Sequence, residues 1–213
     1  MNKIVFFIMS CCISLYISGC SSRSSLETKQ VAELPSLSCV AVLPAAVPIS
    51  GSDGVSKEMS ESLAQGARSL DLILMETLGS KKEFKVLSAN QLDAILPNPW
   101  GGRIKQIRDI GQATGCGAVL ESSIGRYRKR VGGEMSVETP AAAAFSMALT
   151  GVEQGGRIWS TSFDEEQKAL FEDIFSFGKA ERRAFKWLSV QELLRDGVDS
   201  RLAEFPYFQE VEE

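Results

Sequence analysis

The sequence predicts an α/β domain with a mixed, five-stranded sheet packed with helices. The continuous apolar run Cys39–Leu43 is typical of a strand buried on both faces. Residues 55–78 then carry apolar side chains every three or four positions, which predicts a long amphipathic helix. Residues 142–150 and 157–163 predict two strands of an antiparallel hairpin, because a glycine pair at 155–156 separates them.

Shorter patterns supply the elements between these three. Residues 84–87 predict a second strand, and Ser88 with Gln91 forms a capping-box pattern that starts a helix to about residue 96. Isoleucines at 104, 107 and 110 mark one face of the next helix, and residues 117–130 predict a third strand.

The end of the chain is predicted to be helical. Apolar positions 170, 174 and 177 share a helical face, and Ser189 with Glu192 forms a second capping box before a helix to Leu202. The order β-α-β-α-α-β-β-β-α predicts parallel strands from the first half and antiparallel strands from the second.

The first twenty residues resemble a bacterial lipoprotein signal. The apolar core Ile4–Ile17 fits the about 7–15 residues of a signal-peptide core and is shorter than the roughly 20 that span a bilayer. Leu15–Cys20 resembles a lipobox, which implies removal of residues 1–19 and lipidation of Cys20. Ser21 after the cysteine implies sorting to the outer membrane, so we expect a lipid anchor on its periplasmic face.

Three regions are therefore expected. Residues 1–19 form the signal peptide, and residues 20–37 form the lipidated cysteine and a flexible tether rich in Ser, Thr, Glu and Lys. Residues 38–213 form one α/β domain with C-terminal helices.

Composition excludes several classes of function. The 213-residue chain has a net charge of −4, whereas a nucleic-acid binder usually has a basic excess. It has no histidine, which removes Ser-His-Asp and Cys-His nucleophiles and histidine-containing zinc sites. We expect no catalytic residue, no metal and no cofactor.

Four segments together resemble a group of periplasmic domains: Val40–Pro44, Phe84–Leu96, Ile110–Leu120 and Gly156–Trp159. The group comprises the curli secretion lipoprotein, the lipoprotein activator of a penicillin-binding protein, and the amino-terminal domain of the Tol-system translocation protein. The resemblance covers roughly residues 38–165. It implies a non-catalytic accessory or assembly factor of an envelope complex that acts by protein binding, with a homo-oligomer also compatible.

Two other functions remain as alternatives. One is a hydrolase or transferase acting on cell-wall or lipid substrates, which the absence of histidine and of a nucleophile motif disfavours. Serine and lysine are too common here to select a Ser-Lys dyad. The other is an auxiliary component of an envelope transporter.

Cys39 and Cys116 open the first and third predicted strands, at the same edge of a parallel arrangement. If the strands are neighbours, the two residues can form a disulfide, provided that their Cα atoms approach within about 7 Å. The alternative is a pair of buried free thiols, which is common for cysteine.

The partner-binding candidates are Trp100, Arg126, Arg128 and Arg130. The three arginines are expected on one strand face, either as a patch for an anionic partner or as charges that protect an edge strand from aggregation. Trp100, in a loop rich in Pro and Gly, is either an exposed partner anchor or a plug at the end of the sheet. Residues 164–166, three consecutive acids, are expected in a solvated loop.

Overall fold

The structure is a computed structural model that describes residues 37–47, 56–97, 100–133, 137–167 and 187–206. Contacts divide the chain into two units, Met1–Glu33 and Leu34–Glu213, and every described residue belongs to the second. The predicted signal peptide, nearly all of the tether and the helical face at 170–177 lie outside the described residues.

A mixed five-stranded sheet in the order β2-β1-β3-β6-β7 forms the centre of the second unit, and the predicted fold class is confirmed. The strand β1 pairs in parallel with β2 and β3, whereas β3, β6 and β7 are antiparallel. Three-residue strands form the parallel edge and strands of ten or eleven residues form the antiparallel part: β1 (Val40–Val42), β2 (Phe84–Val86), β3 (Ala118–Arg128), β6 (Ala142–Gly151) and β7 (Arg157–Glu166).

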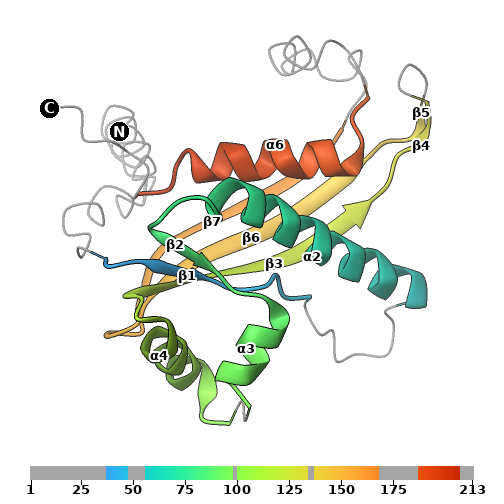
Figure 1. Cartoon of the computed structure of the whole chain (residues 1–213). Coiled ribbons are helices and arrows are strands. Elements are labelled where there is room, and N and C mark those ends of the chain that lie inside the picture. The colour runs from blue at the N-terminus through green and yellow to red at the C-terminus, as the bar shows by residue number, and fades with distance from the viewer. Residues whose placement is uncertain (1–36, 48–55, 98–99, 134–136, 168–186, 207–213) are drawn as a thin grey trace, which may run out of the picture. The chain divides into compact units, whose positions relative to one another are not determined.

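Helices cover the sheet on both faces (Figure 1). The helices α2 (Lys57–Leu78) and α6 (Val190–Leu202) pack on one face, where they enclose the larger apolar cluster. The helices α3 (Ala89–Ile95) and α4 (Gly102–Thr114) pack on the other face, over β1 and the start of β3, around a smaller cluster. This division follows from connections that leave β1 and β2 toward opposite faces.

Two predicted helix starts agree with the structure because local hydrogen bonds determine them. Ser88 and Ser189 both form complete capping boxes with the residue three positions later. The side chain of Ser56 accepts a hydrogen bond from the N–H of Met59, which places the start of α2 two residues later than predicted.

Close packing between α2 and β3 requires a glycine in the helix. A Cβ atom at Gly66 would lie 2.7 Å from the Cβ of Tyr127 and 2.9 Å from Cγ1 of Ile124. Any side chain at position 66 would therefore push the helix away from the strand.

One prediction about the antiparallel part was wrong, and one pair of strands was missed. Residues 164–166 belong to β7 and form no loop. The strand β3 pairs with β1 only through Ala118–Leu120, and its segment with Arg126 and Arg128 pairs with β6 alone among the described strands, so protection of a strand edge by these arginines stays a prediction. The sequence also gave no indication of a two-stranded ribbon between β3 and β6, formed by β4 (Val131–Gly132) and β5 (Val137–Thr139).

Candidate functional site

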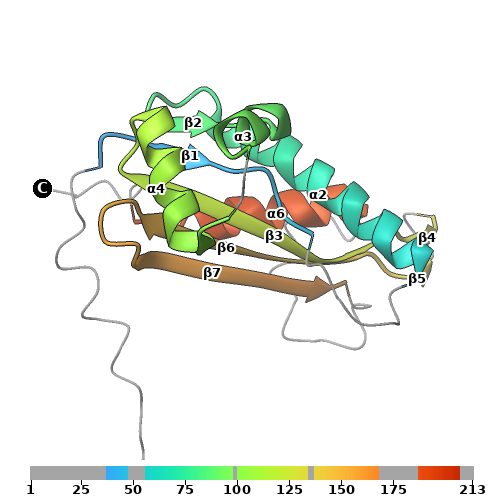
Figure 2. The ribbon, with the colours of Figure 1, turned by 90° about the horizontal axis from the view of Figure 1, so that it is seen from below.

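The antiparallel strands present one face that no described helix covers. The opposite face of the same strands packs under α2 and α6, through residues such as Ile124, Phe145 and Phe163. Because side chains alternate along a strand, the neighbours of these residues point the other way, where α3 and α4 cover β1, the start of β3 and the adjoining end of β6 (Figure 2). We call this surface the open sheet face; it comprises Glu121, Ser123, Arg126, Arg128, Ala142, Ala144, Ser146, Ala148, Ser160, Ser162, Asp164 and Glu166.

A row of serines crosses the middle of the open sheet face. Ser123 of β3, Ser146 of β6 and Ser162 of β7 are aligned in register. The hydroxyl oxygens of Ser123 and Ser146 lie 2.8 Å apart, within hydrogen-bond distance. The row is flat because its side chains are small, and it presents hydroxyl groups that both donate and accept hydrogen bonds.

Ion pairs cross the far end of the same face. Arg126 aligns with Ala144 and then with Asp164, so its guanidinium extends over the alanine methyl to reach the carboxylate two strands away. The guanidinium of Arg128 likewise extends over Ala142, and its Nη2 lies 2.5 Å from Oε1 of Glu166. The alanines are necessary for these contacts, because a larger side chain on β6 would block them.

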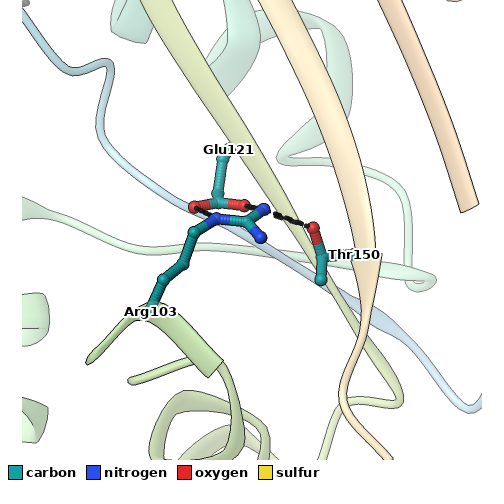
Figure 3. Close-up of polar contacts among 3 residues, drawn as sticks. All are labelled: Arg103, Glu121 and Thr150. Carbon is teal, nitrogen blue, oxygen red and sulfur yellow. Dashed lines mark hydrogen bonds and ion pairs between the residues drawn. The ribbon is translucent and has the colours of Figure 1, made fainter. Parts of the chain in front are cut away.

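Arg103 forms a second polar cluster where α4 meets the sheet (Figure 3). Its Nε donates to Glu121 at 3.2 Å and its Nη2 pairs with the other oxygen of the same carboxylate. The same Nη2 donates to the hydroxyl of Thr150 at 2.8 Å, and that hydroxyl lies 3.2 Å from Glu121. The cluster ties α4 to β3 and β6 at the border of the open sheet face.

Trp100 lies just before α4, and 84% of its surface is exposed. The ring does not plug the sheet end, which was one of the two alternatives. Ile104, one turn further on, is also half exposed. One side of Ile104 packs closely against Gly155, because a Cβ atom added to Gly155 would lie 3.0 Å from its Cγ2. The start of α4 therefore adds an exposed apolar edge next to the Arg103 cluster.

The three predicted arginines do not act as one group. Arg126 and Arg128 point onto the open sheet face and are paired with acids, so they are not an unpaired patch for an anionic partner. Arg130 lies beyond the end of β3 and donates to the carbonyl oxygen of Trp187, next to the start of α6.

Sequence reasoning missed Arg103, Glu121 and Thr150. A usable signal was Glu121 itself, because an acid that directly follows the buried run Ala118–Leu120 needs a partner. Nothing in the sequence pointed to Arg103 or Thr150, which are 18 and 29 residues from that acid.

Cys39 and Cys116 form a disulfide, with the two Sγ atoms 1.98 Å apart and the Cα atoms 4.6 Å apart. Each cysteine lies just before its strand, where the N–H of Gly117 donates to the carbonyl of Cys39. Of the two alternatives that the sequence left open, the structure has the disulfide. It links β1 to β3 within the smaller apolar cluster.

Two further searches covered only the described part of the chain. In these residues, no three His, Cys, Asp or Glu side chains gather in a way that could hold a metal ion. None of their helices combines the length and the apolar character that crossing a bilayer requires.

No family model matches this chain, and no curated protein matches it. Solved structures with a similar fold include the PelC dodecamer from Paraburkholderia phytofirmans, at 14% identity and a TM-score of 0.43 over 75% of this chain and 81% of that one. The LpoB C-terminal domain from Salmonella enterica has 23% identity and a TM-score of 0.33 over 61% and 83%. A lipoprotein from Neisseria meningitidis has 15% identity and a TM-score of 0.32 over 69% and 93%. These values are too low to transfer a function.

Proposed function

We propose that this chain is an outer-membrane-anchored periplasmic lipoprotein that acts as a non-catalytic accessory or assembly factor of an envelope complex. In this proposal residues 1–19 are removed, Cys20 carries the lipid, residues up to 37 form the tether and the α/β domain binds a protein partner. The observation that carries the proposal is the open sheet face, a broad surface that the described helices leave uncovered.

The composition of the open sheet face favours a protein partner over an anionic lipid or polymer. Its arginines are neutralised by acids on the same face, so the surface offers no net positive charge. Tryptophan and arginine at its border are the residue types that dominate protein interfaces. The partner that fits is a folded envelope domain with an apolar recess for Trp100 and hydrogen-bonding groups opposite the serine row.

The disulfide supports the extracytoplasmic location, because disulfides persist in oxidising compartments and are rare in the cytosol. Thiol labelling of denatured protein from intact cells checks this point. We expect Cys39 and Cys116 to react with a maleimide only after reduction. Reaction without reductant would contradict an oxidising location.

Replacement of Cys20 checks the anchor. The Cys20→Ser protein should carry no label from a radioactive fatty acid and should remain uncleaved. A wild-type protein that is soluble and free of lipid would overturn the anchored part of the proposal.

Site-specific photocrosslinking in cells tests the binding surface. A photoreactive residue at Ser146 or Ser162 should yield the same adduct with one envelope protein, in stoichiometric amounts. The same residue at Ser200, an exposed serine on α6, is the matched control and should not yield it. Trp100→Ala should reduce the adduct at Ser162, because it removes the expected anchor.

Three outcomes would overturn the binding proposal. An adduct of two copies of this chain would show that the occupant is a second copy. Equal adducts at Ser162 and Ser200 would show that the open sheet face is not a specific surface. Turnover of a cell-wall substrate by the purified chain would show that the protein is an enzyme.

A further inference from the structure

A pocket of about 380 Å³ lies at the carboxyl ends of β1 and β2. The two strands are parallel neighbours, but the chain leaves β1 toward α2 on one face and leaves β2 toward α3 on the other. Connections that diverge in this way leave a crevice at the strand ends, and such crevices are the usual ligand sites of α/β sheets. Figure 1 shows α2 and α3 on either side of these strand ends.

The pocket wall is mainly apolar. Leu72 and Met75 on α2 contribute side chains that are 65% and 47% exposed, although both are large apolar residues. Since a water molecule occupies about 30 Å³ of liquid, the volume holds about a dozen non-hydrogen atoms. That size suits one medium-length hydrocarbon chain and is too small for the two chains of a phospholipid.

Among the described residues, two charged side chains line the pocket, and they differ in the hydrogen bonds that they can offer a ligand. Asp71 already accepts the backbone N–H of Ala45 at 2.6 Å. Burial raises the pKa of the Asp71 carboxyl above 3.8, and the hydrogen bond from Ala45 opposes that rise. Arg68, one turn earlier on α2, is exposed and has no hydrogen-bond or ion-pair partner among the described residues. Its guanidinium is always charged and carries five N–H donors.

We propose that this pocket binds a single-chain anionic amphiphile, with its hydrocarbon chain between α2 and the strand ends and its carboxylate or phosphate on Arg68. The positive charge of Arg68 would repel a cationic amphiphile, and a neutral amphiphile would leave the N–H donors of Arg68 without a charged acceptor. The site lies away from the open sheet face, and it stands or fails independently of the partner-binding proposal.

Photolabelling of the full chain in its native membranes tests the site. The probe is decanoate with a diazirine at the end of its chain, and mass spectrometry maps the labelled peptides. We expect label in residues 68–75 and 86–89, and an excess of unlabelled decanoate should remove it. Decanol, which has the same chain but no charge, should compete at least about tenfold less well, because it lacks the charge-assisted hydrogen bonds.

Two substitutions with opposite effects distinguish a pocket that binds an anionic headgroup from a pocket that binds any apolar chain. Arg68→Gln should lower labelling about tenfold, the loss expected for a hydrogen bond to a charged group. Asp71→Asn should raise labelling, because it removes a negative charge from the pocket. Arg108→Gln, an exposed arginine on α4 at the other face, is the matched control and should leave labelling unchanged.

Steric closure gives a further check. Ala89 is exposed at the pocket rim, so Ala89→Trp should fill the pocket and abolish labelling there. If that variant does not fold, Met75→Glu serves instead, because it places a negative charge on an exposed wall position and should exclude the anion.

Competition distinguishes the sources of the ligand. Displacement at a lower concentration of decanoate than of an anionic lysophospholipid supports a free carboxylate, and the reverse order supports a lysophospholipid headgroup. The proposal is overturned if neither competes, if decanol competes equally, or if label is spread evenly over α4 and α6. Equal effects of Arg68→Gln and Arg108→Gln would overturn it as well.

Discussion

The two faces of the antiparallel sheet carry very different side chains on the same strands. On β6, Phe145 and Met147 point under α2 and α6 and are almost fully buried, whereas Ala144 and Ser146, which alternate with them, point onto the open sheet face. Burial of apolar surface rewards large side chains only where a second layer covers them. The covered face therefore accounts for stability, and the open face is free to be shaped by other requirements.

The open sheet face is nevertheless not random in composition. Its charged groups are paired in rows over alanines, and its serines are aligned, so it is flat and close to neutral. A surface of this kind presents no unpaired row of arginines to anions. The contrast with the covered face can be tested by paired substitutions.

The largest difference is expected from removal of a side chain on each face. Leu70→Ala, on α2 where the helix packs against the covered face, should lower the free energy of unfolding by about 2–5 kcal/mol, because it leaves a cavity. Ser146→Ala on the open face should change it by no more than about 0.5 kcal/mol. Urea denaturation measures both. A large loss from Ser146→Ala would indicate that the open face is buried in the purified protein, as in a homo-oligomer.

A smaller loss in the free energy of unfolding is expected where the covered face has no space for an added side chain. The overlap of the new Cβ in Gly66→Ala with Tyr127 should cost about 1–3 kcal/mol, and the gain in helix propensity should offset about 1 kcal/mol of this, so the free energy of unfolding should fall by up to about 2 kcal/mol. Ser60→Ala, an exposed position on the same helix, is the control and should be neutral or slightly stabilising. A stabilised Gly66→Ala variant would show that α2 is not held against β3.

Substitutions in the Arg103 cluster should have an intermediate effect on the free energy of unfolding, because Glu121 is partly buried and Thr150 is fully buried. Glu121→Gln should cost about 1 kcal/mol, since it weakens the paired hydrogen bonds to Arg103. Adding Arg103→Gln to this variant should cost little more, because the same interaction is already lost. Simple additivity of the two effects would contradict the cluster.

The exposed ion pairs of the open face should contribute least among the contacts. A double-mutant cycle with Arg126→Ala and Asp164→Ala should give a coupling energy of about 0.2–1 kcal/mol. The coupling should shrink as ionic strength rises, because salt screens exposed charges. A coupling that salt does not change would show that the pair is desolvated.

The smallest effect concerns the pH dependence of Asp71. Its pKa is higher in the folded protein than the usual 3.8, so the folded state binds the proton more tightly. The wild-type protein therefore loses stability as the pH rises from about 3.8 through the folded pKa, and Asp71→Asn does not. The melting temperature of the variant minus that of the wild type should grow over this window. A difference that shrinks instead would mean that the folded pKa is lowered.

The elements of this fold were readable from sequence where the cause is local. The two capping boxes at Ser88 and Ser189 depend on residues three positions apart, and both form. The apolar run at 40–42 predicted a strand buried on both faces, and its residues are at most 3% exposed. The long helix and the hairpin follow from short-range periodicity in the same way.

The candidate surface was not readable, because its contacts join distant segments. Arg126 and Arg128 alternate with the same period as Asp164 and Glu166, and this complementary pattern was the available signal. It was missed because residues 164–166 were assigned to a loop. Charged residues that alternate along two strands can be assigned as partners only once the register between the strands is known, and that register is a tertiary property.

By itself, the sequence determined the class of fold, the starts of the two helices with capping boxes and the two segments of the hairpin, because hydrogen bonds and apolar periodicity within a few residues decide them. Only the tertiary structure decided that Cys39 meets Cys116, that Arg103 meets Glu121, and that β3, β6 and β7 share an uncovered face. Those outcomes depend on strand order and register, which arise when segments far apart in the chain pack together.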